Sequence, residues 1–376
     1  MIVGNMRALL FFIAIGLFGQ EPPDIDGLLK TAHAAYRKAD YPAARKSLEE
    51  AWTAAGDLPQ NDPKRYEILK QLSAVLSSAG ENEEAEKYVE LAINWRETAV
   101  GRDDPLIADD MVALATICER RKDFDRAIAI LRQVIAIHAK AHGNFENSDV
   151  ADDFSRIALV QAQDNKPEVA IPTLLTVIVI REKVLGAESP GLLTELDRLG
   201  ALQISARAYD DAEITFRREL VIRERVLRSK SPDLLTTLDG LAYSLFGQKK
   251  YDDAEPFYKR LLDLWTLIGN IPMIAETDEK IAVFYRAQQK WDEGTEAAAN
   301  AIALRALVSA AGLSTEATQW LAHGDKAHGI EYYRKALATL DPNRKDHDGL
   351  RAQLEHVLAG LDPPKPAKMP VKKKQP

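Results

Sequence analysis

A ten-residue phrase occurs twice in this chain, forty-two residues apart. Residues 209–218 read YDDAEITFRR and residues 251–260 read YDDAEPFYKR. Each phrase is built around an alanine, and seven sites with similar surroundings follow one another along the sequence: Ala44, Ala85, Ala127, Ala170, Ala212, Ala254 and Gly294. The intervals between them are 41, 42, 43, 42, 42 and 40 residues. A step this regular predicts an array of similar structural repeats.

A second small residue precedes each of these reference sites by twelve positions: Ala32, Ser73, Ala115, Ala158, Gly200, Ala242 and Ala282. Large apolar residues lie four positions after the reference site in most repeats, and another apolar residue lies three further on, with Glu219 as the exception. Spacings of three and four place residues on one face of a helix. Each repeat is therefore predicted to hold two amphipathic helices, which approach closely where their side chains are small.

The turn between the two helices carries an aromatic residue in most repeats: Tyr41, Phe124, Tyr209, Tyr251 and Trp291. The pairs Asp104-Pro105, Ser189-Pro190 and Ser231-Pro232 are predicted to start helices, since a capping side chain precedes a proline at the first helical position. A two-helix repeat cannot bury its apolar face alone, so the repeats must stack on one another. The sequence predicts an all-α solenoid.

The order of these features resembles the tetratricopeptide repeat. The longer, 42-residue step and the closing segments IREKVLGAESP and IRERVLRSKSP resemble the kinesin-light-chain type of that repeat. The resemblance covers residues 25–302 and implies a right-handed superhelix of antiparallel helix pairs. We expect an array of seven to eight repeats over residues 25–345, with a degenerate eighth repeat around 329–342 and Trp320 on the helix before it. An amphipathic closing helix is expected over 346–361.

The two ends of the chain differ from the array. Residues 1–20 hold one cation, Arg7, and an apolar run from Ala8 to Gly19. This pattern predicts a signal peptide, or an uncleaved N-terminal anchor, and hence export to the periplasm or exterior of a bacterial envelope. A cytoplasmic location follows if the segment is not a signal. Residues 362–376 are rich in proline and lysine and are expected to form a disordered tail, which either keeps the chain soluble or contacts anionic membrane or cell-wall polymer.

Several classes of function do not fit this sequence. The net charge of −8 argues against nucleic-acid binding. The motifs of nucleotide-binding loops, nucleophile elbows and common zinc helices are absent, so we expect no catalytic residues, no cofactor and no metal. His138 and His142 have a spacing that suits a metal but lack a third ligand, and two solvated histidines near a helix end are the favoured interpretation. The single cysteine, Cys118, is expected to be buried.

What remains is a binding surface. The resemblance implies that the first helix of each repeat lines a concave groove that holds a protein or peptide partner. The candidate partner-binding residues are Arg156, Asp197, Arg198, Asp239, Tyr243, Phe246 and Arg286. Glu119, Ser155, Leu159, Glu279 and Val283 are also expected to face the groove. The asparagine pair common in kinesin-light-chain repeats is replaced here, for example by Asp239-Gly240, so that binding mode does not transfer directly.

The sequence therefore predicts a non-catalytic interaction scaffold that binds a partner segment with apolar and acidic side chains. The alternative is a self-assembling structural component of the cell envelope.

Overall fold

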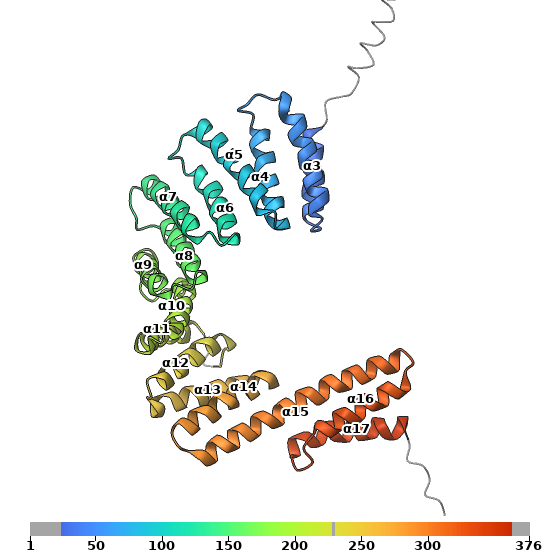
Figure 1. The fold of residues 1–376 in the computed structure, drawn as a ribbon. Helices are drawn as coiled ribbons and strands as arrows, with labels where there is room; N and C mark the ends of the chain where they lie inside the picture. The colour runs from blue at the N-terminus through green and yellow to red at the C-terminus, as the bar shows by residue number, and fades with distance from the viewer. Residues whose placement is uncertain (1–23, 228–229, 363–376) are drawn as a thin grey trace, which may run out of the picture. The chain divides into compact units, whose positions relative to one another are not determined.

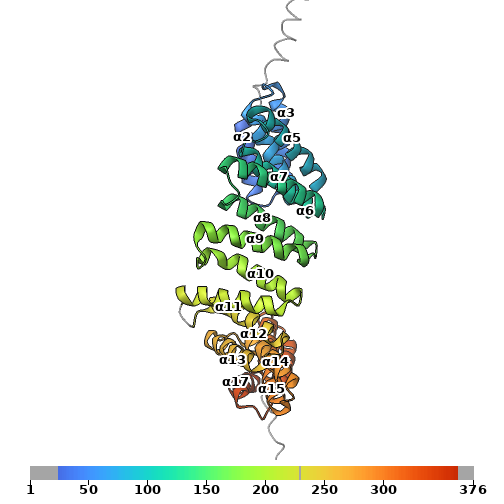
Figure 2. The same cartoon turned by 90° about the vertical axis from the view of Figure 1, so that its left-hand side faces the viewer.

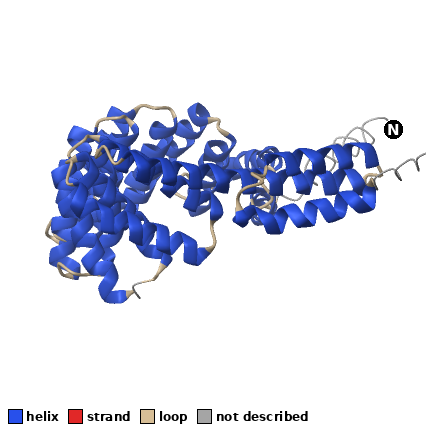
Figure 3. Ribbon diagram, turned by 90° about the horizontal axis from the view of Figure 1, so that it is seen from below, coloured by secondary structure: helices blue, strands red, loops and turns tan. Residues whose placement is uncertain are grey.

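The computed structural model of the protein describes residues 24–227 and 230–362. These residues contain sixteen α-helices and no strand, as predicted (Figures 1 and 3). The helices are α2 (Ile25–Tyr36), α3 (Tyr41–Ala54), α4 (Pro63–Ala79), α5 (Asn82–Val100), α6 (Leu106–Arg120), α7 (Phe124–His142), α8 (Ser148–Gln163), α9 (Pro167–Leu185), α10 (Leu193–Ser205), α11 (Tyr209–Val226), α12 (Leu235–Gly247), α13 (Tyr251–Ile268), α14 (Ile271–Ala287), α15 (Trp291–Ala322), α16 (Lys326–Thr339) and α17 (Asp348–Leu361).

The predicted repeat register is confirmed. The first helices of the seven repeats are the even-numbered helices α2 to α14, and the second helices are α3 to α13 together with the first half of α15. The seven reference sites and the seven small residues that precede them are all buried. Both Ala212 and Ala254 have no exposed surface. The small side chains therefore lie in the contacts between helices, where their size permits close approach.

The chain divides into two compact units, residues 1–202 and 203–376, with the boundary inside α10. We call them the N-terminal and the C-terminal unit. In the N-terminal unit the helices pack in sequence order, and Figure 2 shows α8, α9 and α10 as successive layers. A continuous apolar core runs from Leu76 in α4 to Ile180 in α9. In the C-terminal unit a second core runs from Ala212 in α11 to Ala297 in α15.

The turn between the first and second helix of each repeat has one residue in the left-handed conformation. Most of these residues are not glycine: Ala39, Lys122, Asn165, Arg207, Lys249 and Gln289, with Gly80 and Gly324 at the equivalent turns. The backbone N–H of the next residue reaches back to the helix, as from Asp123 to Cys118 and from Lys250 to Leu245, at 2.9 Å in both cases. This is the hydrogen bond of a Schellman cap, which satisfies a free carbonyl at the helix end.

All three predicted helix starts differ slightly from expectation. Asp104 accepts a hydrogen bond of 2.9 Å from the backbone N–H of Leu106, and α6 begins at Leu106, one residue after the proline. Ser189 and Ser231 do cap, since each accepts a hydrogen bond from the backbone N–H two residues later. The prolines that follow them begin short 3-10 turns, Pro190–Leu192 and Pro232–Leu234, rather than the α-helices themselves. The α-helices α10 and α12 begin only at Leu193 and Leu235.

An eighth helix pair follows the seventh without a loop. The 32-residue helix α15 serves the seventh repeat with its first half and the eighth with its second half, which packs against α16. A Cβ added at Gly294 would lie 3.2 Å from the carbonyl oxygen of Ala282, and one added at Gly329 would lie 3.2 Å from that of Ala317. Gly329 is thus the eighth reference site, only 329 − 294 = 35 residues after the seventh, because the connecting loop is missing.

The closing helix α17 packs against α16 and completes a small core around Tyr333 and Leu354. Among the described helices, α15 alone has the length and apolar composition that would allow it to cross a bilayer. The predicted signal segment, residues 1–20, and almost all of the predicted tail, residues 363–376, lie outside the described residues.

Candidate partner-binding surfaces

Buried contacts between a basic residue and an acid join successive repeats in the N-terminal unit. Arg96 on α5 lies 2.9 Å from Asp110 on α6, and His138 on α7 lies 2.7 Å from Asp153 on α8. The third link runs from Arg181 on α9 to Glu195 on α10 at 3.4 Å. In each pair the acid is less than a tenth exposed. The two members recur at steps of 42 and 43 residues, so the pairs are a regular part of the repeat in this unit.

The third link forms the floor of a hollow of about 470 Å³ on α8, α9 and α10. Ser155 donates a hydrogen bond to the carboxylate of Glu195 at 3.1 Å and accepts one from Arg198 at 3.0 Å. Arg198 also lies 3.3 Å from Glu195. Arg198 therefore lines the hollow, but its charge is largely balanced within the protein.

Arg156 is the candidate residue of this hollow that remains accessible. It is exposed, and no ion pair of Arg156 occurs within residues 24–227. The nearby carboxyl of Glu119 has a raised pKa because it is partly buried, an effect that the positive charge of Arg156 opposes. Leu159, more than a third exposed, adds an apolar wall. Asp197 is half-buried on the same helix as Arg198 but does not line the hollow.

The C-terminal unit has a different surface on its first helices. A cleft of about 230 Å³ lies between α12 and α14, with Tyr258 of α13 at its floor. Its apolar walls are Tyr243, Phe246 and Val283, of which Tyr243 is 41% and Val283 is 56% exposed. The ring of Tyr243 lies 6.4 Å from that of Phe246, between centroids. The two predicted aromatic residues are therefore brought together in one apolar cleft.

Polar groups form the rim of this cleft. Lys280 donates hydrogen bonds of 2.8 and 2.9 Å to the two carboxylate oxygens of Asp239. The candidate residue Asp239 therefore holds the side chain of Lys280 in place. Glu276 and Glu279 complete the rim. Arg286 is exposed on α14 but does not line the cleft, and its side-chain stem instead lies over Gly294. The structure thus separates Arg286 from the other three predicted residues of this unit.

The exception in the repeat pattern has a structural explanation. Glu219 on α11 is completely buried, accepts a hydrogen bond of 2.8 Å from Arg223, and accepts another from Thr237 on α12. Thr237 occupies the position that holds Asp110, Asp153 and Glu195 in the preceding repeats. In this repeat the acid, Glu219, therefore lies on the second helix instead of the first, and a polar contact still joins the two repeats.

The remaining candidates for chemistry are structural. His138 is largely buried against Asp153, which corrects the expectation that it is solvated, whereas His142 contacts Asp149 at 2.6 Å and is 45% exposed. Cys118 is buried, as predicted, and burial raises the pKa of its thiol. The described residues include no group of three side chains that could hold a metal ion.

Sequence reasoning missed Arg181, Glu195 and Lys280. A signal for the first two was present, because Arg96, His138 and Arg181 share one register of the repeat and Asp110, Asp153 and Glu195 share another. Buried charges are rare unless they are paired, so two charged positions recurring at the same step indicate partners. A signal for Lys280 was present as well, because Arg156, Arg198 and Lys280 share one register of the repeat.

The fold defines a helical-repeat protein of the solenoid class. A sequence model of the tetratricopeptide repeat matches residues 65–140 and 195–266. The C-terminal part of a tetratricopeptide-repeat-containing protein from Cytophaga hutchinsonii is similar in structure, with a TM-score of 0.51 and 15% identity, covering 86% of this chain and 99% of that chain. No curated protein matches the chain in sequence.

Two further solved structures are similar. Kinesin light chain nearly identical TPR-like repeats from Podosopora anserina give a TM-score of 0.47 at 18% identity, covering 56% of this chain and 99% of that chain. BtubC (BKLC) from P. vanneervenii gives 0.47 at 22% identity, covering 64% and 92%. With its repeat register, its helix pairs and the matching sequence model, this chain contains tetratricopeptide repeats and has the fold of a solenoid built from them. Proteins of this fold are in general scaffolds that bind other proteins.

Proposed function

We propose that this protein is a non-catalytic scaffold whose α12–α14 cleft takes an apolar side chain from an extended segment of a partner protein. The observation that carries the proposal is the exposure of Tyr243 and Val283 over the buried ring of Tyr258. Aromatic residues that surround a small pocket are typical anchors of protein interfaces. The rim of Lys280, Glu276 and Glu279 supplies polar groups around that anchor.

The experiment is site-specific photo-crosslinking of the full chain in native cells, with a photoreactive phenylalanine analogue at position 243. The matched control carries the same analogue at Ile214, which is 68% exposed on α11. We expect a crosslinked partner from position 243 that position 214 does not give. Binding of the crosslinked segment should then weaken at least about tenfold in Val283→Arg, because a charge would occupy the apolar cleft. Identical crosslinks from both positions would contradict the proposal.

In the N-terminal unit, Arg156 is proposed to bind an acidic side chain of a partner. Its support is the exposure of this guanidinium beside the hollow, in contrast to Arg198, whose charge Glu195 balances. Arg156→Glu should weaken partner binding and Arg132→Glu, on α7, should not. Equal effects of the two changes would indicate a general charge effect rather than a site.

Export is a further part of the proposal, and it rests on the sequence of residues 1–20 alone. The apolar run from Ala8 to Gly19 has the length of a signal-peptide core. Cell fractionation and N-terminal sequencing of the purified protein test it, and a cytoplasmic protein that begins at Met1 would contradict it. Contact of the lysine-rich end with anionic surfaces is tested by sedimentation with anionic vesicles at low salt, with and without residues 362–376.

A further inference from the structure

Helix α9 is apolar on its outer side as well as on the side that faces the core. Its outer stripe consists of six exposed residues within one 100° sector: Glu168, Pro172, Leu175, Thr176, Val179 and Lys183. Leu175 is 46% and Val179 is 51% exposed. The four central positions of this stripe carry no charge, so the most solvated face of the helix is also an apolar one.

In each of the other six repeats at least one of the same four positions carries a charge. They hold Lys46 and Glu49 in α3, Lys87 and Glu90 in α5, Arg132 in α7, Arg217 and Arg218 in α11, Lys259 and Arg260 in α13, and Glu296 in α15. Charged residues on this face keep a second helix soluble in water. Their loss in α9 alone indicates that this face is covered in the working protein.

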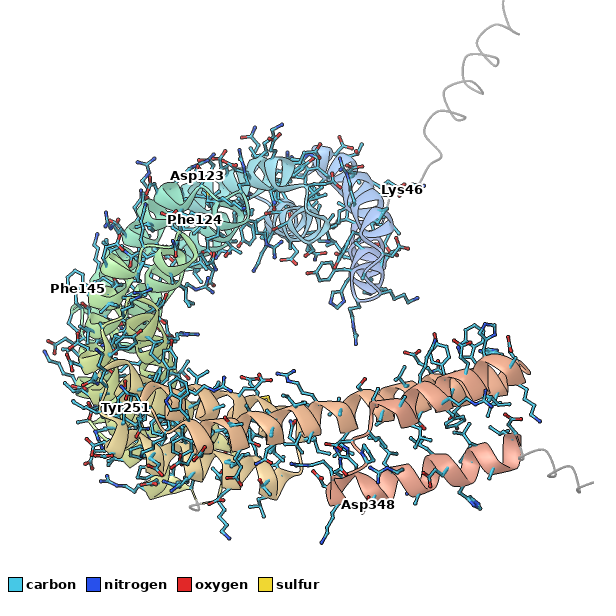
Figure 4. The ribbon with its side chains drawn as sticks, turned by 60° about the horizontal axis from the view of Figure 1, so that its bottom comes forward. Lys46, Asp123, Phe124, Phe145, Tyr251 and Asp348 are labelled. Atoms are coloured by element: carbon cyan, nitrogen blue, oxygen red, sulfur yellow. The ribbon has the colours of Figure 1, made fainter. Side chains whose placement is uncertain are left out.

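An apolar hollow adjoins the outer stripe. It has a volume of about 460 Å³ and lies between α9 and the turn that precedes α8. Phe145 of that turn is 58% exposed, and Figure 4 shows it at the outer edge of the ribbon. Glu146 and Lys183 form an ion pair at the edge of the hollow and both remain more than half exposed. Stripe and hollow together form one continuous apolar surface with charges at its ends.

The stripe of one copy is complementary to the stripe of a second copy that runs in the opposite direction. Consider two α9 helices that pair antiparallel about a two-fold axis between residues 175 and 176. Residues at equal distances on either side of the axis then face each other, and their two numbers add up to 351. Glu168 then faces Lys183 of the second copy, Pro172 faces Val179, and Leu175 faces Thr176. We propose that the outer stripe of α9 is a homodimer interface in which two copies of this chain pair in this way.

The size of the surface sets the strength of the dimer. A 19-residue helix is about 28 Å long, and one helix pair with its flanks buries less than the ~800 Å² per partner of a standard interface. The dimer is therefore a weak one, with a dissociation constant on the order of 10–100 µM. The opposite charges at both ends of the stripe fix the antiparallel direction, because a parallel pairing would place like charges together.

Sedimentation equilibrium of the full chain over a range of concentrations tests the proposal. We expect the wild type to dimerise and Val179→Arg to raise the dissociation constant at least about tenfold, because each arginine would bury a charge against Pro172 of the second copy, in the apolar part of the stripe. Thr53→Arg, the same register position on α3, is the matched control and should leave dimerisation unchanged. Thr53 is exposed, so both changes add one charge to a second helix.

Charge exchange tests the antiparallel geometry itself. Glu168→Lys should weaken the dimer severalfold, since it sets two lysines together at both ends. Lys183→Glu should weaken it at least as much, since it sets two glutamates together and also removes the ion pair with Glu146 of the same copy. The double variant restores opposite charges and should bind within about threefold of the wild type. A chain that stays monomeric up to about 200 µM, or a dimer unaffected by Val179→Arg, would overturn the proposal and leave the stripe to another occupant. Failure of the double variant to recover would overturn the antiparallel pairing.

Discussion

The two units build the polar contact between successive repeats in different ways. In the N-terminal unit an acid on each of the first helices α6, α8 and α10 pairs with a basic residue on the preceding second helix, as Asp110 does with Arg96. In the C-terminal unit the acid Glu219 lies on the second helix and Thr237 completes the contact from the first. At the next boundary Asp278 is buried on α14, and no hydrogen bond or ion pair of Asp278 occurs within residues 230–362.

The comparison shows that the repeat fixes a place for a polar contact rather than the residues that make it. The acid can sit on either helix as long as a cation or hydroxyl group meets it, because burial is costly only for an uncompensated charge. Asp278 violates this condition. It occupies a register position that is apolar in all six preceding repeats, for example Leu238 in α12 and Leu196 in α10. Removing a charge should therefore destabilise the protein at Arg96 and stabilise it at Asp278.

The largest effect is expected from Arg96→Ala. This change leaves Asp110, which is 3% exposed, without its cation, and removes the guanidinium that lies 4.2 Å from the ring centre of Tyr66. Breaking a buried ion pair costs about 3–5 kcal/mol. The free energy of unfolding, measured by urea denaturation, should fall by that amount. Adding Asp110→Asn, which keeps an acceptor for the Tyr66 hydroxyl, should recover at least half of the loss, and no recovery would show that packing rather than charge matters here.

Asp278→Leu should have the opposite sign. Burial raises the pKa of this carboxyl from 3.8 to about 6, so ionisation opposes folding. The destabilisation is absent below pH 4, grows as the pH rises from 4 to 6, and is complete above 6. A shift of this size corresponds to up to about 3 kcal/mol, and the variant should be more stable than the wild type by that amount at pH 8. A gain that is equal at pH 4 and pH 8 would mean that leucine acts by packing alone.

Much of the fold was predictable from the sequence, because the repeat multiplies a weak signal. The reference sites could be compared seven times, and their burial followed directly. Features that occur once could not be compared in this way. The fusion of two helices in α15 depends on the absence of a loop. The contact of Lys280 with Asp239 uses the same two register positions as that of Arg198 with Ser155, but the acceptor is a different residue type, so the repeat pattern does not identify the partner. The sequence therefore predicted on which helix face the candidate residues lie, but not which side chains they contact.

Moving the acid of the C-terminal unit tests the comparison directly. Glu219→Val alone removes the acceptor that Thr237 and Arg223 share, and should cost about 2 kcal/mol. Combined with Thr237→Glu, it recreates the arrangement of Arg181 and Glu195, with Arg223 at the cation position. The double variant should return to within about 1 kcal/mol of the wild type in chemical denaturation. Additive losses would show that the two units are not interchangeable at this contact.

The smallest effect concerns the turn that both units share. Lys249 in the C-terminal unit and Gly80 in the N-terminal unit hold equivalent left-handed positions, with φ of 62° and 85°. This conformation costs a side-chain-bearing residue about 1–2 kcal/mol, whereas glycine adopts it freely but loses more entropy on folding. Lys249→Gly should therefore raise the free energy of unfolding by about 0.5 kcal/mol, and Gly80→Ala should lower it by about 1 kcal/mol. Since a Cβ at Gly80 would meet no atom within 4 Å, the loss there would come from the backbone alone. Paired thermal melts of the two variants decide the matter, and a destabilised Lys249→Gly would show that the lysine side chain contributes more than its backbone strain costs.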